Sequence, residues 1–191
     1  MDNFQIRKRN SMLKIDKSKK GSIDKPIISL LKRINAIDGI YSTSSCSGRI
    51  VLLYTNNSHK KNTVSWLLST HQKVNYREIS KALKTIPKKG TILFLFESPI
   101  LHIACKTQEL ALTLIKITRK SGFKKSYILS LTPDQCVVEM MGNLRIEMPI
   151  AFDSKIIIDE QGLKKVTNLA NAKLQQSHKL LKKLESEIKK W

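Results

Sequence analysis

Apolar residues recur along the chain with two different periods, and these periods separate the expected helices from the expected strands. Spacings of three and four residues predict helices over 4–15, 26–35, 76–86, 108–121 and 160–191. Runs of apolar and β-branched residues predict strands over 50–54, 64–70, 91–97, 100–105, 126–131, 136–141, 144–148 and 156–158. Strands that follow one another directly, with helices scattered among them, favour an α+β fold.

Local signals mark the ends of two of these helices. Asn75 with Glu78 forms a capping-box pattern, Thr107 is suited to cap the next helix, and Gly122 follows that helix directly. No segment rich in Pro or Gly divides the chain, and no internal repeat is present. We therefore expect a single domain over residues 1–191, with a mixed, largely antiparallel sheet, several flanking helices and a long C-terminal helix. The absence of a P-loop and of a GxGxxG motif indicates that the fold is not of the Rossmann type.

The densest group of polar side chains lies at 41–50, directly before an apolar strand. It combines hydroxyls and a thiol with Gly48, which allows close backbone approach to a ligand, and with Arg49, whose planar fork suits carboxylate or phosphate. A serine-rich hairpin turn is the alternative interpretation of the stretch. For Arg49 the alternative is an internal ion pair with a carboxylate such as Asp24 or Glu97.

The charge balance predicts an acidic partner. The chain has 35 Lys and Arg residues against 15 Asp and Glu residues, which gives a formal net charge of +20. Nucleic acid is the first expectation and an anionic membrane surface the second, because no strongly amphipathic basic helix carries Trp or Phe on its apolar face. No apolar run reaches transmembrane length, and no signal-peptide pattern is present. The three cysteines are far apart and form neither a CxxC motif nor a zinc pattern, so we expect a reduced, cytoplasmic protein without a metal site.

Several residues have both a structural and a chemical interpretation. Asp16 and Asp24 lie in or beside a polar loop and either cap a helix, which the sequence favours, or contact a charged ligand. Cys46 either fills a tight turn or acts as a nucleophile with His71 or His102 as its base. Both His71 and His102 lie at or inside apolar runs, where a structural role is the more common one.

Seven consecutive residues, Ser44-Ser45-Cys46-Ser47-Gly48-Arg49-Ile50, resemble the signature of the tRNA wybutosine-synthesizing protein 3 family. Further motifs of the family are matched in order along nearly the whole chain. They are Asp16 with Lys20 to Asp24, Trp66 to Leu68 with Thr70 and His71, Phe96 and Glu97 with Pro99, His102 and Cys105, Ser121 to Lys124, Glu147 with Pro149, and Asn168 with Ala170, Asn171 and Lys173. The chain departs from the family pattern at Gln72 and in the loop 140–143.

The resemblance implies methyl transfer from S-adenosyl-L-methionine to N4 of the tricyclic 7-aminocarboxypropyl-demethylwyosine base at position 37, in the anticodon loop of phenylalanine tRNA. It places the signature residues Ser44, Ser45, Cys46, Ser47, Gly48 and Arg49 in the expected active site, where they bind the cofactor or, as the alternative, the polar end of the substrate base. Asp24, Glu97 and His102 are then the candidate proton acceptors, and Asp16, Lys20 and His71 are candidate substrate-binding residues. The rival classes are a non-catalytic basic RNA-binding module and another RNA-modifying enzyme that uses Cys46.

Overall fold

The computed structural model describes residues 2–13, 23–56 and 64–191, and these form two compact units that are interleaved in the sequence. The first unit contains the described residues of Met1–Ser47, Pro99–Asn143 and Ser177–Trp191. The second unit contains those of Gly48–Ser98 and Leu144–Gln176. Within the described residues, no helix combines the length and the apolar character needed to cross a bilayer.

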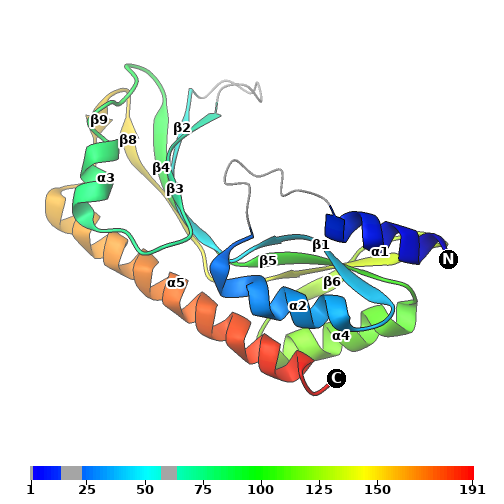
Figure 1. Ribbon diagram of the computed structural model, residues 1–191. Helices are drawn as coiled ribbons and strands as arrows, with labels where there is room; N and C mark the ends of the chain where they lie inside the picture. The colour runs from blue at the N-terminus through cyan, green and yellow to red at the C-terminus, as the bar shows by residue number, and fades with distance from the viewer. Residues whose placement is uncertain (1, 14–22, 57–63) are drawn as a thin grey trace. The chain divides into compact units, whose positions relative to one another are not determined.

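The first unit is a four-stranded sheet with helices on both faces (Figure 1). Its strand order is β1-β5-β7-β6, and every pairing is antiparallel. The elements are α1 (Asn3–Leu13), the 3-10 helix η1 (Lys25–Ile27), α2 (Ile28–Ala36), β1 (Ile40–Cys46), β5 (Ile100–Cys105), α4 (Gln108–Ser121), β6 (Lys125–Leu131), β7 (Cys136–Met141) and the last turns of α5 (Glu160–Ile188).

Side-chain alternation gives the first sheet two different faces. Leu101 and Ile103 of β5 and Val138 of β7 belong to the main core, together with apolar residues of α2, α4 and α5. The residues between them in the sequence point the other way, where Phe4 of α1 packs on Tyr41 in an edge-to-face contact at 5.1 Å between ring centroids. The face opposite the main core is therefore covered at one end by α1 and carries the polar residues described below.

The second unit is a five-stranded antiparallel sheet with the order β3-β2-β4-β8-β9. Its elements are β2 (Arg49–Thr55), β3 (Val64–Thr70), α3 (Tyr76–Ala82), β4 (Thr91–Glu97), β8 (Ile146–Phe152), β9 (Lys155–Ile156) and the first turns of α5. The apolar faces of α3 and α5 pack with residues such as Leu52 and Phe94 of the sheet in one core. β8 extends beyond the predicted end at Met148 because Pro149 lies at a shift in the pairing register with β4.

The predicted α+β class, the antiparallel pairing and the long C-terminal helix are confirmed. The strands are divided between two sheets, whereas a single sheet was expected. The single domain over 1–191 stays a prediction. The predicted helix ends are also found: Asn75 and Glu78 form a reciprocal capping box, Thr107 accepts from Leu110 N–H, and Gly122 ends α4 at a φ of 107°.

Candidate functional site

The signature stretch is mostly strand. Ser44, Ser45 and Cys46 are the last residues of β1, Arg49 is the first residue of β2, and only Ser47 and Gly48 connect them. β1 and β2 belong to different sheets, so the hairpin interpretation of this stretch is wrong. Gly48 has a φ of 90°, a conformation that costs L-residues about 1–2 kcal/mol and that glycine adopts freely.

A β-bulge determines which way the signature side chains of β1 point. Ser42 pairs with Ile103, but the next pair is Ser44 with His102, so Thr43 is the extra residue of the bulge. An unbroken register would place Thr43 opposite His102, and the bulge places Ser44 there instead. Bulges of this kind often lie next to active sites, where they redirect a side chain.

Four polar side chains form one row across the first sheet, each from a different strand. Ser44 of β1 is opposite His102 of β5, which is opposite Glu139 of β7, which in turn is opposite Tyr127 of β6. Ser44 Oγ lies 2.7 Å from His102 Nδ1, and His102 Nε2 lies 2.7 Å from Glu139 Oε2. Tyr127 donates its hydroxyl hydrogen bond to Glu139 Oε1. We call Ser44, His102, Glu139 and Tyr127 the polar row.

The hydrogen bonds of the polar row determine the state of its members. An ionised Glu139 only accepts, so His102 Nε2 carries a proton and donates it to the carboxylate. In the neutral ring, Nδ1 then accepts from the Ser44 hydroxyl. Hydrogen bonds from Tyr127 and then from His102 hold the pKa of Glu139 below its ordinary value, while the same carboxylate raises the pKa of Tyr127. The row is therefore a polarised serine hydroxyl supported by a histidine and a carboxylate.

Asp24 contacts the signature from the segment before α2. Its Oδ2 accepts a hydrogen bond of 2.9 Å from the backbone N–H of Ser47, and both residues are buried. Asp24 also occupies the N-cap position of η1 but makes no side-chain capping bond there, so the capping interpretation of Asp24 is wrong. Its carboxylate instead holds the backbone of the signature at Ser47, directly after the end of β1. Among the described residues, the buried hydroxyl of Ser47 has no hydrogen-bond partner.

Arg49 is placed by two neighbours in the second unit. Its Nε donates to Glu97 Oε2, from the position directly opposite on β4. Its guanidinium carbon lies 4.1 Å from the ring centroid of Trp66 of β3. The ion pair with Glu97, one of the alternatives that the sequence left open, is present in the structure.

His71 follows β3 and contacts Gly48, which lies between β1 and β2 in the sequence. Its Nδ1 lies 2.8 Å from the carbonyl oxygen of Gly48. A carbonyl only accepts, so Nδ1 is the protonated nitrogen, and in the neutral ring the lone pair lies on Nε2. Asp16 and Lys20, which were candidates for substrate binding, lie outside the described residues.

The structure thus joins the candidate residues in pairs. Ser44 contacts His102, Asp24 contacts Ser47, Arg49 contacts Glu97, and His71 contacts Gly48. Glu139 and Tyr127 were not among the sequence-based candidates. A single carboxylate inside the apolar strand 136–141 was the available signal for Glu139, because a buried carboxylate requires partners.

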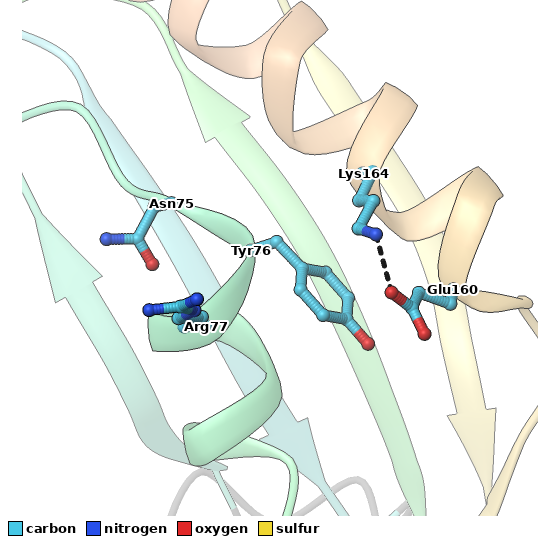
Figure 2. Close-up of a pocket in the computed structure, with 5 residues that line it drawn as sticks. All are labelled: Asn75, Tyr76, Arg77, Glu160 and Lys164. Carbon is cyan, nitrogen blue, oxygen red and sulfur yellow. Dashed lines mark ion pairs between the residues drawn. The ribbon is translucent and has the colours of Figure 1, made fainter.

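The second unit also contains an open pocket of about 610 Å³ that is lined by Asn75, Tyr76, Arg77, Glu160 and Lys164 (Figure 2). Lys164 pairs with Glu160 at 2.5 Å, and its ammonium nitrogen lies 5.1 Å from the ring centroid of Tyr76. None of the sequence-based site residues lines this pocket.

Comparison with known proteins identifies the class to which this fold and site belong. The model of the family described as Methyltransferase TYW3 matches residues 5–190, and the chain belongs to that family. The family resemblance inferred from the signature is therefore confirmed, as is the prediction of a methyltransferase. Membership of a methyltransferase family implies that the chain uses a methyl donor.

Individual relatives agree with this assignment. The chain is 35% identical over 188 residues to the tRNA(Phe) 7-((3-amino-3-carboxypropyl)-4-demethylwyosine(37)-N(4))-methyltransferase 1 of Pyrococcus furiosus, which covers 98% of this chain and 95% of the relative. It is 36% identical over 191 residues to the enzyme of the same name, without the number, from Thermococcus sibiricus, covering 98% and 95%. The solved structure of PH1069 protein from Pyrococcus horikoshii superposes with a TM-score of 0.89 at 34% identity, covering 97% of this chain and 96% of that one.

Proposed function

We propose that the chain is an S-adenosyl-L-methionine-dependent tRNA methyltransferase that methylates N4 of the 7-(3-amino-3-carboxypropyl)-4-demethylwyosine base at position 37 of phenylalanine tRNA. The observation that carries the proposal is the match, over 98% of the chain, to an enzyme whose name states this reaction. The net charge of +20 supports a polyanionic substrate. Three free thiols agree with a reduced, cytoplasmic setting.

The signature residues are the proposed cofactor site. S-adenosyl-L-methionine supplies a methyl group on an already activated sulfonium and carries a carboxylate, an ammonium group and ribose hydroxyls. The signature offers matching groups: the Ser44 hydroxyl and the Cys46 thiol on one face of β1, the Ser47 hydroxyl, the closely approachable backbone at Gly48, and the guanidinium of Arg49. Ser45 lies on the opposite face of β1 and is a candidate through the family signature alone. The buried Ser47 hydroxyl, which lacks a partner among the described residues, supports a polar ligand here.

The polar row offers a route for the proton that N4 must lose. A bound S-adenosyl-L-methionine would supply the methyl group and keep the electron pair of the C–S bond on sulfur, and N4 would then have to lose its proton. In the proposed step Ser44 Oγ accepts the N4 proton while its own proton passes to His102 Nδ1. The resulting imidazolium is stabilised by the Glu139 carboxylate at Nε2.

His102 is the preferred acceptor among the three candidates because of its contacts. Glu97 is already paired with the guanidinium of Arg49, and Asp24 holds the backbone N–H of Ser47. Proton transfer to either carboxylate would weaken a bond that supports the signature itself. His102 instead gains an interaction when it becomes charged, since its other nitrogen already faces a carboxylate.

The anticodon loop is the proposed region of the tRNA that the chain contacts. A base in a single-stranded loop is cheaper to unstack than one in a duplex, and it needs little energy to reach a catalytic group. Asp16, Lys20 and His71 stay candidates for contact with this substrate, and the basic surface would neutralise phosphates.

The decisive experiment is methyl transfer in vitro with purified chain, S-adenosyl-L-methionine and phenylalanine tRNA that carries the unmethylated tricyclic base. Mass spectrometry of the digested nucleosides should show one added methyl group, and a His102→Ala protein is the matched control. Tight tRNA binding without methylation and without cofactor binding by calorimetry would favour the RNA-binding module. If the His102→Ala protein methylates the tRNA at the wild-type rate, the proposed proton route through His102 is refuted, while the assignment as a methyltransferase stands.

A further inference from the structure

Trp66 has an unusual setting in the second unit. It lies in β3, which is an edge strand of the sheet, and 45% of its surface is exposed. Tryptophan has the largest aromatic ring system of the amino acids, and a half-exposed indole presents a flat π-surface together with its edge. Its position on an edge strand leaves part of this ring accessible to a ligand.

The indole is held in place by a chain of contacts. The Arg49 guanidinium stacks over the ring at 4.1 Å from the centroid, and the same guanidinium is tied through Nε to Glu97. These three side chains come from adjacent strands, β3, β2 and β4. Because a restrained ring loses little rotational freedom when it binds a flat partner, this arrangement is preorganised for stacking.

We propose that Trp66 is a stacking platform for an unpaired nucleobase of the tRNA. The inference rests on the proposed function, from which it takes the tRNA substrate, and adds a site that recognises a base by its π-face. Bases of single-stranded RNA loops commonly stack on aromatic side chains, and this contact tolerates any base. The charge of the chain favours RNA as the occupant, because a net charge of +20 attracts a polyanion to an exposed aromatic surface flanked by an arginine.

The chain offers a clean spectroscopic test because it contains only two tryptophans, Trp66 and Trp191. Both are partly exposed, at 45% and 38%, so Trp191 is a matched control. In a Trp191→Phe protein all indole fluorescence comes from Trp66. Titration with phenylalanine tRNA should quench this emission and protect it from acrylamide. In a Trp66→Phe protein the emission of Trp191 should be unaffected by tRNA.

Affinity provides the second readout. Trp66→Leu should weaken tRNA binding by on the order of 5- to 150-fold, the usual effect of losing one stacked base, and Trp66→Tyr should recover most of the loss. Trp191→Leu should bind as the wild type does. The slope of log affinity against log salt should stay unchanged in Trp66→Leu, because no phosphate contact is removed. Thermal unfolding of each variant separates a lost contact from a lost fold.

The outcomes distinguish this inference from the proposed function. If tRNA binds and is methylated while Trp66 emission and the Trp66→Leu affinity stay at wild-type values, the stacking platform is refuted and the enzyme assignment remains. If the wild-type chain neither binds nor methylates the tRNA, the proposed function itself fails. A reduced salt slope in a folded Trp66→Leu protein would also count against stacking, since it would indicate lost phosphate contacts.

Discussion

Replacing Glu139 by Gln tests the polar row without changing its shape. The amide oxygen can still accept from His102 Nε2, and the amide nitrogen can donate to the Tyr127 hydroxyl, so both contacts have a neutral counterpart. What the substitution removes is the negative charge. That charge matters most when the imidazole of His102 becomes a cation during proton transfer.

The size of the effect follows from the kind of hydrogen bond involved. A bond to a charged group contributes about 1.5–3 kcal/mol and a neutral one about 0.5–1.5 kcal/mol, so the transition state loses roughly 1–1.5 kcal/mol. At about 1.4 kcal/mol per tenfold change in rate, kcat should fall roughly 5- to 12-fold. Removing the imidazole itself in His102→Ala should cost more, on the order of 100-fold or above, the usual contribution of a general base.

Single-turnover methylation of phenylalanine tRNA, with calorimetric cofactor binding and thermal unfolding in parallel, measures these effects separately. Glu185→Gln is the matched control, because the Glu185 carboxylate also accepts from a hydroxyl, that of Ser29, and from a nitrogen donor, Arg33 Nε, but lies outside the polar row and the family motifs. It should leave kcat unchanged. A folded Glu139→Gln protein that binds cofactor normally and keeps kcat within about twofold would refute the role of the carboxylate in the proton step.

Four further predictions concern stability, thiol chemistry and electrostatics. Hydrogen bonds from Tyr127 and His102 hold the pKa of Glu139 below its ordinary 4.5 in the folded state, so its contribution to stability is complete above 4.5 and is lost as pH falls through the folded pKa; urea unfolding of Glu139→Gln should therefore depend less than that of the wild type on pH below 4.5. Burial raises the pKa of Cys105 to about 12 and also raises that of Cys136, so a thiol reagent at neutral pH should label only the half-buried Cys46 in the folded chain and all three thiols in urea. Arg49→Lys should lower the free energy of unfolding by about 0.5–1 kcal/mol, because lysine keeps the charge but loses the Nε contact with Glu97 and the flat stacking on Trp66; an unchanged melting temperature would show that neither contact is structural. The affinity for tRNA should fall steeply as the salt concentration rises. An affinity that does not change with salt would contradict binding through phosphate contacts.

Local sequence signals predicted most elements of this fold. The capping box at Asn75 and the αL end of α4 at Gly122 were identifiable because short-range hydrogen bonds and backbone conformation determine them. The division into two sheets was not predictable in this way. β1 pairs with β5 across three intervening strands, and the apolar character of a strand does not specify which partner it will find.

The sequence predicted several residues of the candidate site but not how they are arranged relative to one another. Ser44, His102 and Arg49 were selected because hydroxyl, imidazole and guanidinium groups are suited to catalysis and binding. Tyr127 and Glu139 were missed, since their relation to His102 depends on the pairing of three strands. Once the strand pairing is known, the contacts of His102 with Glu139 and of Glu139 with Tyr127 follow from it. Residues directly opposite on antiparallel strands share a face of the sheet and lie within reach of one another.

The bulge at Thr43 explains why a serine-rich strand can serve as a site at all. Strict alternation from Tyr41, which packs under α1, would direct Thr43 and Ser45 to the same face and turn Ser44 toward the main core. The extra residue reverses this alternation, so Ser44 and Cys46 take the face that carries His102 and Glu139. Thr43 then donates its hydroxyl to the His102 carbonyl oxygen at 3.1 Å, which anchors the bulge to the strand it redirects. A strand holds its side chains more rigidly than a loop does. One inserted residue in β1 is therefore enough to direct Ser44 and Cys46 away from the main core and onto the face that carries His102.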